Sequence, residues 1–223
     1  MALISGIYPK VRIEAPGVPE PLLEDVVGAA IEDFFRESEA WRHTTTTLLD
    51  WTTALPFPAL TAGTELPADT RLHRVDVVKY GAQGANLRPV PFHTRQDLDC
   101  IWQDWEIRTS NTPEAWTNDP NGAAPRLVPA ADADQVGVLQ VRSIVVPTSS
   151  MTDINDYFYE EFHDAWRWGA LARLLKMPGR DWTNLSLAAF YERKEEDAQK
   201  MAKSQAEAEY GQPNRRVMAY GGL

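Results

Sequence analysis

The sequence predicts an α+β protein: an antiparallel-type three-helix bundle with an inserted β-rich domain and a flexible C-terminal tail. Apolar residues recur every three or four positions near both ends of the chain, which is typical of amphipathic helices. The region between them is rich in β-branched residues, prolines and glycines, and no alternating βαβ units are visible. We therefore expect an arm and first bundle helix (1–40), a β-rich insertion domain (41–147), a helical hairpin completing the bundle (148–210) and a tail (211–223).

The first fourteen residues are expected to form an extended arm, which ends at a proline- and glycine-rich stop over 15–19. A helix should follow, because Pro21 suits a first helical turn and Glu20 and Glu24 are favourable near a helix N-terminus. Its apolar side recurs to about Ala40 through Leu22, Leu23, Val26, Val27, Ala30, Ile31, Phe34 and Phe35.

The clearest predicted strands cover 42–51, 71–80 and 136–146. Between the second and third, Thr94 and Asp97 stand in capping-box spacing and predict a short helix. We expect residues 105–109 to return as a strand, and the turn-rich stretch 111–125 to be an exposed loop.

The last third is predicted to be helical. Ser150 and Asp153 stand in capping-box spacing before a periodic apolar run that ends at Met177-Pro178-Gly179. A second helix should run from Asn184 to about Tyr210, with 192–197 as a solvated mixed-charge surface.

The composition is that of a globular protein that carries no enzyme signature. The 223 residues include 22 basic and 32 acidic groups, so a formal net charge of −10 opposes tight wrapping of nucleic acid. Residues 1–40 carry a net charge of −5, whereas 211–223 carry +2. No apolar run approaches the ~18 residues that span a bilayer, and the N-terminus does not resemble a secretory signal.

Residues with potential chemistry are scattered. The four histidines are far apart in sequence, and the single cysteine, Cys100, is expected to be a packed thiol in a reducing compartment. Asp132 and Asp134 lack the later ligands of a calcium loop. We therefore expect no catalytic, cofactor-binding or metal-binding residues.

Several segments resemble a known family. The segments occur in the order Arg126–Pro129, Gly137–Val141, Trp168–Leu175, Pro178–Asn184 and Leu187–Tyr191, and Tyr8–Arg12 and Ala40–Arg42 are similar as well. Together they resemble the head-to-tail adaptor (connector) proteins of tailed bacteriophages.

The resemblance implies a structural virion protein at the head–tail junction, made in the host cytoplasm. It implies a ring, usually of twelve subunits, that lies beneath the portal protein, extends the DNA channel and receives a tail or nozzle protein. Genomic DNA would only pass through, no membrane would be involved, and an acidic lumen would let DNA slide without sticking. The charged faces of helices 21–40 and 184–210 offer complementary signs for contacts between neighbouring subunits.

The most specific part of the resemblance also predicts a rigid helical hairpin. Gly169 and Ala170 are small and allow another helix to approach closely, and Pro178 and Gly179 turn the chain tightly. Trp182 is expected to close the end of the hairpin, and Asn184 to cap the returning helix.

The tail is expected to bind the portal. Glycines and Pro213 oppose helix formation there, and similar adaptors reach into the portal with C-terminal extensions. The expected portal-binding residues are Arg215, Arg216, Val217, Met218, Tyr220 and Leu223.

Two alternatives remain. One is a tail completion or stopper protein that contacts the adaptor. The other is a carboxylate-dependent hydrolase using Asp97, Asp99 and Asp104, although these acids are better explained as one polar face of a short helix.

Overall fold

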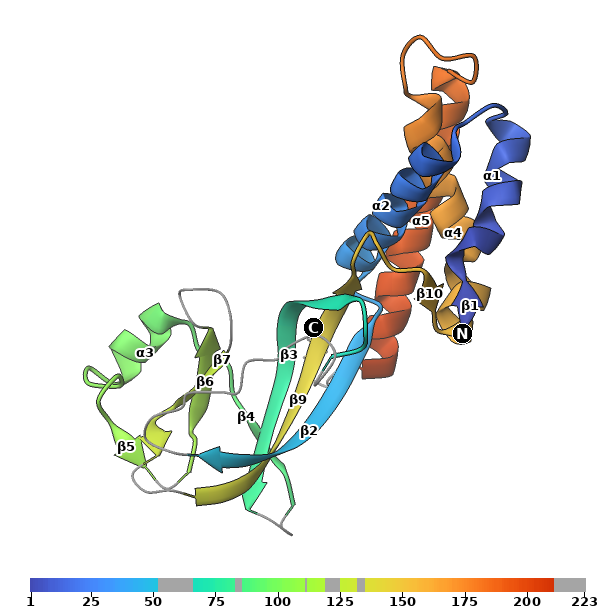
Figure 1. The fold of residues 1–223 in the computed structure, drawn as a ribbon. Coiled ribbons are helices and arrows are strands. Elements are labelled where there is room, and N and C mark those ends of the chain that lie inside the picture. The colour runs from blue at the N-terminus through green and yellow to red at the C-terminus, as the bar shows by residue number, and fades with distance from the viewer. Residues whose placement is uncertain (52–65, 83–85, 111, 119–124, 132–134, 211–223) are drawn as a thin grey trace, which may run out of the picture. The chain divides into compact units, whose positions relative to one another are not determined.

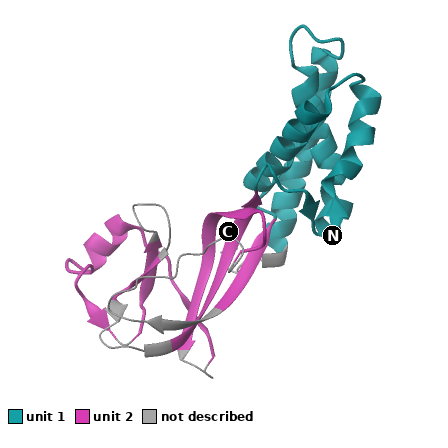
Figure 2. Ribbon diagram, viewed as in Figure 1, with its two compact units in different colours: residues 1–40, 148–223 teal, residues 41–147 magenta. Residues whose placement is uncertain are grey.

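The computed structural model describes residues 1–51, 66–82, 86–110, 112–118, 125–131 and 135–210. Within these residues the protein is mixed α/β, with five α-helices and mostly antiparallel sheets, which confirms the predicted mixture (Figure 1). The chain divides into two compact units (Figure 2). Unit 1 comprises Met1–Ala40 and Thr148–Leu223, and unit 2 comprises Trp41–Pro147.

Unit 1 is mainly helical. Its elements are β1 (Ala2–Leu3), the 3-10 helix η1 (Ile4–Ile7), α1 (Tyr8–Glu14), α2 (Glu20–Ser38), β10 (Asp153–Ile154), α4 (Asp156–Leu175) and α5 (Leu185–Tyr210). Helices α2, α4 and α5 each contact the other two, and α1 contacts α4. The short strands β1 and β10 pair in antiparallel orientation.

The N-terminal segment is helical, so the predicted extended arm is wrong. Ile4, Ile7 and Val11 are buried at spacings of three and four, which is the pattern of an amphipathic helix. Pro9 lies in the first turn of α1, where its missing N–H needs no partner. Pro9 is therefore compatible with a helix start.

The predicted helix over 21–40 is confirmed as α2. Pro21 lies in its first turn, and the helix ends where Glu39 adopts a left-handed conformation with φ of 53°. The Glu39 N–H donates to the carbonyl oxygen of Phe35 at 3.0 Å, which satisfies one terminal carbonyl.

Aromatic rings form the centre of unit 1. The ring centroids of Phe34 and Phe162 lie 5.0 Å apart, and those of Phe35 and Trp166 lie 5.8 Å apart. Phe34, Phe35 and Trp166 are fully buried. Aromatic pairs stabilise packing beyond the effect of the apolar area that they bury, so these rings hold α2 against α4.

Helix α4 begins later than predicted. Asn155 is its N-cap, and the side chain of Asn155 accepts a hydrogen bond from the Tyr157 N–H at 3.0 Å. The capping box of Ser150 and Asp153 is therefore wrong, because Asp153 lies in β10 and pairs with Leu3 of β1.

Unit 2 is built on a four-stranded antiparallel sheet in the order β2-β9-β3-β4. The strands are β2 (Arg42–Trp51), β9 (Gln135–Pro147), β3 (Thr70–Ala82) and β4 (Arg88–Val90). The first three confirm the strands predicted over 42–51, 136–146 and 71–80. The carboxylate of Asp76 joins them, since it accepts from Arg42 at 3.2 Å and from Arg142 at 2.8 Å.

The rest of unit 2 contains α3 (Arg95–Ile101), β5 (Thr109–Ser110), β6 (Ala115–Asn118), β7 (Pro125–Val128) and β8 (Ala130–Ala131). The predicted capping box is confirmed: the Thr94 side chain accepts from the Asp97 N–H, and the Asp97 side chain accepts from the Thr94 N–H.

Two predictions for unit 2 are wrong. Residues 105–107 form turns rather than a strand, and strand β5 starts only at Thr109. The stretch 111–125 contains β6, and Trp116 on that strand is 3% exposed and packs with Val78 and Leu127. Pairing with β7 buries this strand in spite of its turn-rich surroundings.

Candidate functional site

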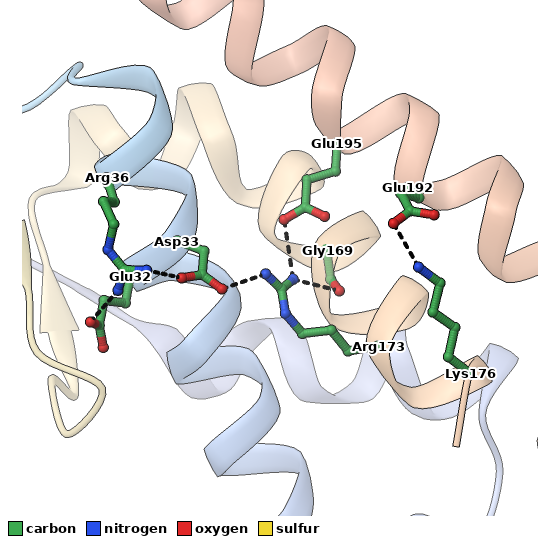
Figure 3. Close-up of polar contacts among 8 residues, drawn as sticks. All are labelled: Glu32, Asp33, Arg36, Gly169, Arg173, Lys176, Glu192 and Glu195. Carbon is green, nitrogen blue, oxygen red and sulfur yellow. Dashed lines mark hydrogen bonds and ion pairs between the residues drawn. The ribbon is translucent and has the colours of Figure 1, made fainter. Parts of the chain in front are cut away.

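Three helices of unit 1 meet around the guanidinium group of Arg173 (Figure 3). Arg173, on α4, donates through Nη2 to Asp33 Oδ2 on α2 at 2.8 Å. Its Nη1 donates to Glu195 Oε1 on α5 at 3.1 Å and to the Gly169 carbonyl oxygen at 2.8 Å. Arg173 therefore ties α2, α4 and α5 together with directional, charge-assisted bonds.

Glu195 is buried, with 8% of its surface exposed. The prediction that 192–197 is a solvated surface is therefore wrong at this position. Gly169 makes room for the carboxylate, because a Cβ built there would overlap Oε1 and lie 2.8 Å from the carboxyl carbon. Ala170, the next residue, is fully buried. Small side chains on α4 thus leave the space that the Arg173–Glu195 pair occupies.

The electrostatics of the pair follow from burial and charge. Burial raises the pKa of Glu195, and nearby Asp33 and Glu192 add to that effect, while Arg173 opposes it. Burial would lower the pKa of Arg173, but the carboxylates of Glu195 and Asp33 outweigh burial and raise it. Arg173 stays charged, and Glu195 binds a proton more readily than an exposed glutamate does.

The network continues to Arg36, and a separate ion pair lies beside it. Arg36 donates to Asp33 Oδ1 and to Glu32 Oε1, each at 2.6 Å, and Lys176, which directly follows α4, pairs with Glu192 on α5 at 2.6 Å (Figure 3). Such partly exposed pairs each contribute about 0–1 kcal/mol. Arg173 is itself partly buried, and among these residues it is the one that bonds to all three helices.

The α4–α5 turn contains the other hairpin residues. Gly179, after Pro178, has a φ of 70°, a conformation that favours glycine. The Asn184 side-chain oxygen accepts from the Leu187 N–H at 3.1 Å, as a cap of α5 does. Trp182 is half-buried, and the Arg180 guanidinium lies 5.9 Å from its ring centroid.

A second polar contact links α1 to α5. The Tyr191 hydroxyl donates to a carboxylate oxygen of Glu14. Burial, together with this bond and the charge of Glu14, raises the pKa of Tyr191 to about 12. The neutral phenol is thus strongly preferred in the folded protein.

The acids of α3 do not gather into one site. Asp97 serves the capping box, and the Thr94 hydrogen bonds lower its pKa. Asp99 accepts from the indole N–H of Trp105 at 2.7 Å. Asp104 is exposed. Asp97 and Asp99 each have a local structural partner, and Asp104 lies beyond the end of α3, so the expectation of one polar helix face for the three acids is wrong.

Other candidate residues are separate as well. Cys100 is exposed, so the expectation of a packed thiol is wrong. Within the described ranges, no group of three or more His, Cys, Asp or Glu side chains could hold a metal ion. Of the helices that the structure describes, none has both the length and the apolar character needed to cross a membrane.

The predicted portal-binding residues lie outside the described part of the chain, as does the whole segment 211–223. Asp132 and Asp134 also lie outside it.

The polar contacts of unit 1 described above join secondary-structure elements to one another. A family model described as SU10 adaptor protein matches residues 6–217. The chain belongs to this family of phage head–tail adaptors, which confirms the resemblance drawn from the sequence. A search of curated proteins finds no match.

Proposed function

We propose that this protein is the structural adaptor that joins portal and tail in a tailed phage. In this proposal, copies of the chain form a dodecameric ring beneath the portal, extend its DNA channel and present a landing surface to a tail or nozzle protein. The observation that carries the proposal is the family match, which spans residues 6–217 and so covers both units. The protein would act in the virion and need no chemistry.

The helices of unit 1 are proposed to form the wall of this ring as a three-helix bundle of α2, α4 and α5. The Arg173 network supports this role, because bonds to Asp33 and Glu195 resist sliding of the helices past one another. A ring wall that transmits load between head and tail needs such a fixed register. Residues 169–184 would keep α4 and α5 together as one rigid hairpin.

The β-rich unit 2 is proposed to receive the tail through residues 54–65 and 119–124, which lie outside the described part of the chain. The net charge of −10 supports a DNA channel that does not retain DNA, since like charges repel at long range.

Residues 211–223 are proposed as the portal anchor. Arg215 and Arg216 would pair with acidic groups of the portal, while Val217, Met218, Tyr220 and Leu223 fill shallow pockets. Truncation after Gln212 should leave helical content unchanged and sharply weaken portal binding. Full binding by the truncated protein would show that the anchor lies elsewhere.

Co-expression with the portal protein tests the whole proposal. Negative-stain electron microscopy of the purified complex should show one ring stacked on another. If the two proteins elute separately and no double ring forms, the adaptor role is wrong for this chain.

A further inference from the structure

A groove of about 440 Å³ opens on unit 1 between β1, the first half of α2 and residues 149–152. Residues 149–152 can lie this close to α2 because position 28 is glycine: a Cβ there would overlap the carbonyl oxygen of Ser149. The groove is therefore a feature of how the backbone crosses α2, and its lining combines apolar, acidic and small polar side chains.

The apolar residues of the lining include Ile4 and Met151, which are buried, and Leu3, which is 61% exposed. Its acidic residues are Glu20, Glu24 and Asp25, and the remainder includes hydroxyl side chains such as Ser5 and Thr152.

The acids of the groove are not neutralised equally. Glu20 pairs with Arg12 at 3.4 Å. Glu24 and Asp25 are exposed and make no side-chain hydrogen bond or ion pair with any residue that the structure describes. Burial raises the pKa of the Tyr8 hydroxyl beside them, and Glu24 and Glu20 raise it further, which indicates a negative potential inside the groove. An apolar group carrying a positive charge would suit this site.

Unit 1 presents such a group on other helices. On α5, Phe190 is 50% exposed, and the ammonium group of Lys194 lies 5.8 Å from its ring centroid. The same ammonium group lies 5.7 Å from the ring of Trp168 on α4. Met201 is 74% exposed and follows Phe190 by eleven residues, or about three turns, so it extends the same side of the helix. We call Trp168, Phe190, Lys194 and Met201 the Lys194 patch.

We propose that the Lys194 patch of one copy docks into the groove of the next copy. Lys194 would pair with Glu24 and Asp25, and Phe190 would lie against the exposed Leu3. The inference rests on the proposed ring, and it goes further by naming the residues through which neighbouring copies join.

A second copy is the occupant that the surfaces favour. Groove and patch match in both charge sign and apolar character, and both belong to the same chain, so every copy supplies one of each. They share no residue, and they are built on different helices, α1 and α2 for the groove and α4 and α5 for the patch. Contact between two different surfaces of identical subunits is head-to-tail, and a head-to-tail contact generates a ring when the rotation closes.

Charge reversal and exchange test the contact in the full chain, co-expressed with the portal and also measured alone by analytical ultracentrifugation. Lys194→Glu should weaken self-association about tenfold or more, as loss and reversal of an interfacial charge pair does. Glu24→Lys with Asp25→Lys should do the same. The variant that combines all three substitutions should recover most of the association, because the pair is restored with exchanged signs. Phe190→Ala should weaken association without altering charge.

Two matched controls should behave as the unchanged protein. Lys203→Glu alters an exposed lysine on the same helix, nine residues and thus two and a half turns from Lys194, on the opposite side. Glu160→Lys reverses an exposed acid on α4. Circular dichroism spectra identical to that of the unchanged protein would show that all variants fold.

The outcomes separate the contact from the function. If portal-bound rings form and Lys194→Glu assembles as well as Lys203→Glu, the docking contact is wrong while the adaptor role stands. If the combined variant associates no better than the separate reversals, the pairing of these charges is wrong. If the unchanged chain never forms a ring, the proposed function and the docking contact fall together.

Discussion

The Arg173 network makes a sharp prediction about Gly169→Ala. In most helices this change stabilises, because alanine is favoured over glycine by about 1 kcal/mol per residue. Here the new methyl group would overlap Glu195 Oε1 and lie 2.9 Å from Arg173 Nη1, so the Glu195 side chain must move. A hydrogen bond to a charged group contributes about 1.5–3 kcal/mol, and its loss outweighs the helical gain. We expect a net destabilisation of about 0.5–2 kcal/mol, once the gain from alanine is subtracted.

A double-mutant cycle isolates the cause. Glu195→Ala alone should destabilise unit 1, because it removes one partner of Arg173. Adding Gly169→Ala to that variant should stabilise it by about 1 kcal/mol, since the obstructing carboxylate is gone and only the helix propensity remains. Thermal unfolding, followed by far-ultraviolet circular dichroism, measures both effects. For a chain of this size, a change of about 1 kcal/mol in the free energy of unfolding shifts the melting temperature by about 2–4 °C. Stabilisation by Gly169→Ala in the unaltered background would refute the reasoning.

Three further predictions concern single side chains. The folded-state pKa of Tyr191, about 12, exceeds the ordinary value of 10.0, so the contribution of Tyr191 to stability is full below pH 10 and declines as the pH rises toward 12. Between these pH values the melting temperature should therefore fall more steeply for the unchanged protein than for Tyr191→Phe. Parallel curves of melting temperature against pH would contradict this. Asp99→Ala should cost unit 2 about 1–3 kcal/mol by leaving the buried Trp105 indole N–H without its acceptor, whereas the exposed Asp104→Ala should change little in denaturant titrations. Trp116→Ala should destabilise unit 2 by about 3–5 kcal/mol, with Ile107→Ala, at a residue that is 79% exposed, as the neutral control; equal effects would mean that β6 is not part of the core.

Local patterns predicted the long elements correctly. Helix α2 has a continuous apolar side and a proline in its first turn, and β9 has β-branched residues that pair on both sides in the sheet. The Thr94–Asp97 capping box was also predictable, because both of its partners lie within four residues. Each of these features depends on residues that are near in sequence.

The errors have long-range causes. Ser150 and Asp153 have the spacing of a capping box, but Asp153 pairs with Leu3 as part of β10, and Asn155 caps α4 instead. The burial of β6 likewise depends on its pairing with β7. The α1 error differs, because the buried residues Ile4, Ile7 and Val11 show helical spacing within the segment itself.

The sequence predicted only some of the residues of the Arg173 site. Gly169 and Ala170 stood out as small residues of the hairpin, whereas Glu195 is one of several charged residues in its stretch of α5 and looked solvated. The available signal was Arg173 itself, a cation within the apolar run of α4. A charge in such a position needs a buried partner, and the partner lies 22 residues away in sequence.

Cryo-electron microscopy of virions that contain this protein tests the central claim most directly. The adaptor role predicts a ring of this chain between portal and tail, with density for unit 1 forming the wall of the DNA channel. Virions in which the chain is absent from the head–tail junction, or lies elsewhere in the particle, would contradict it.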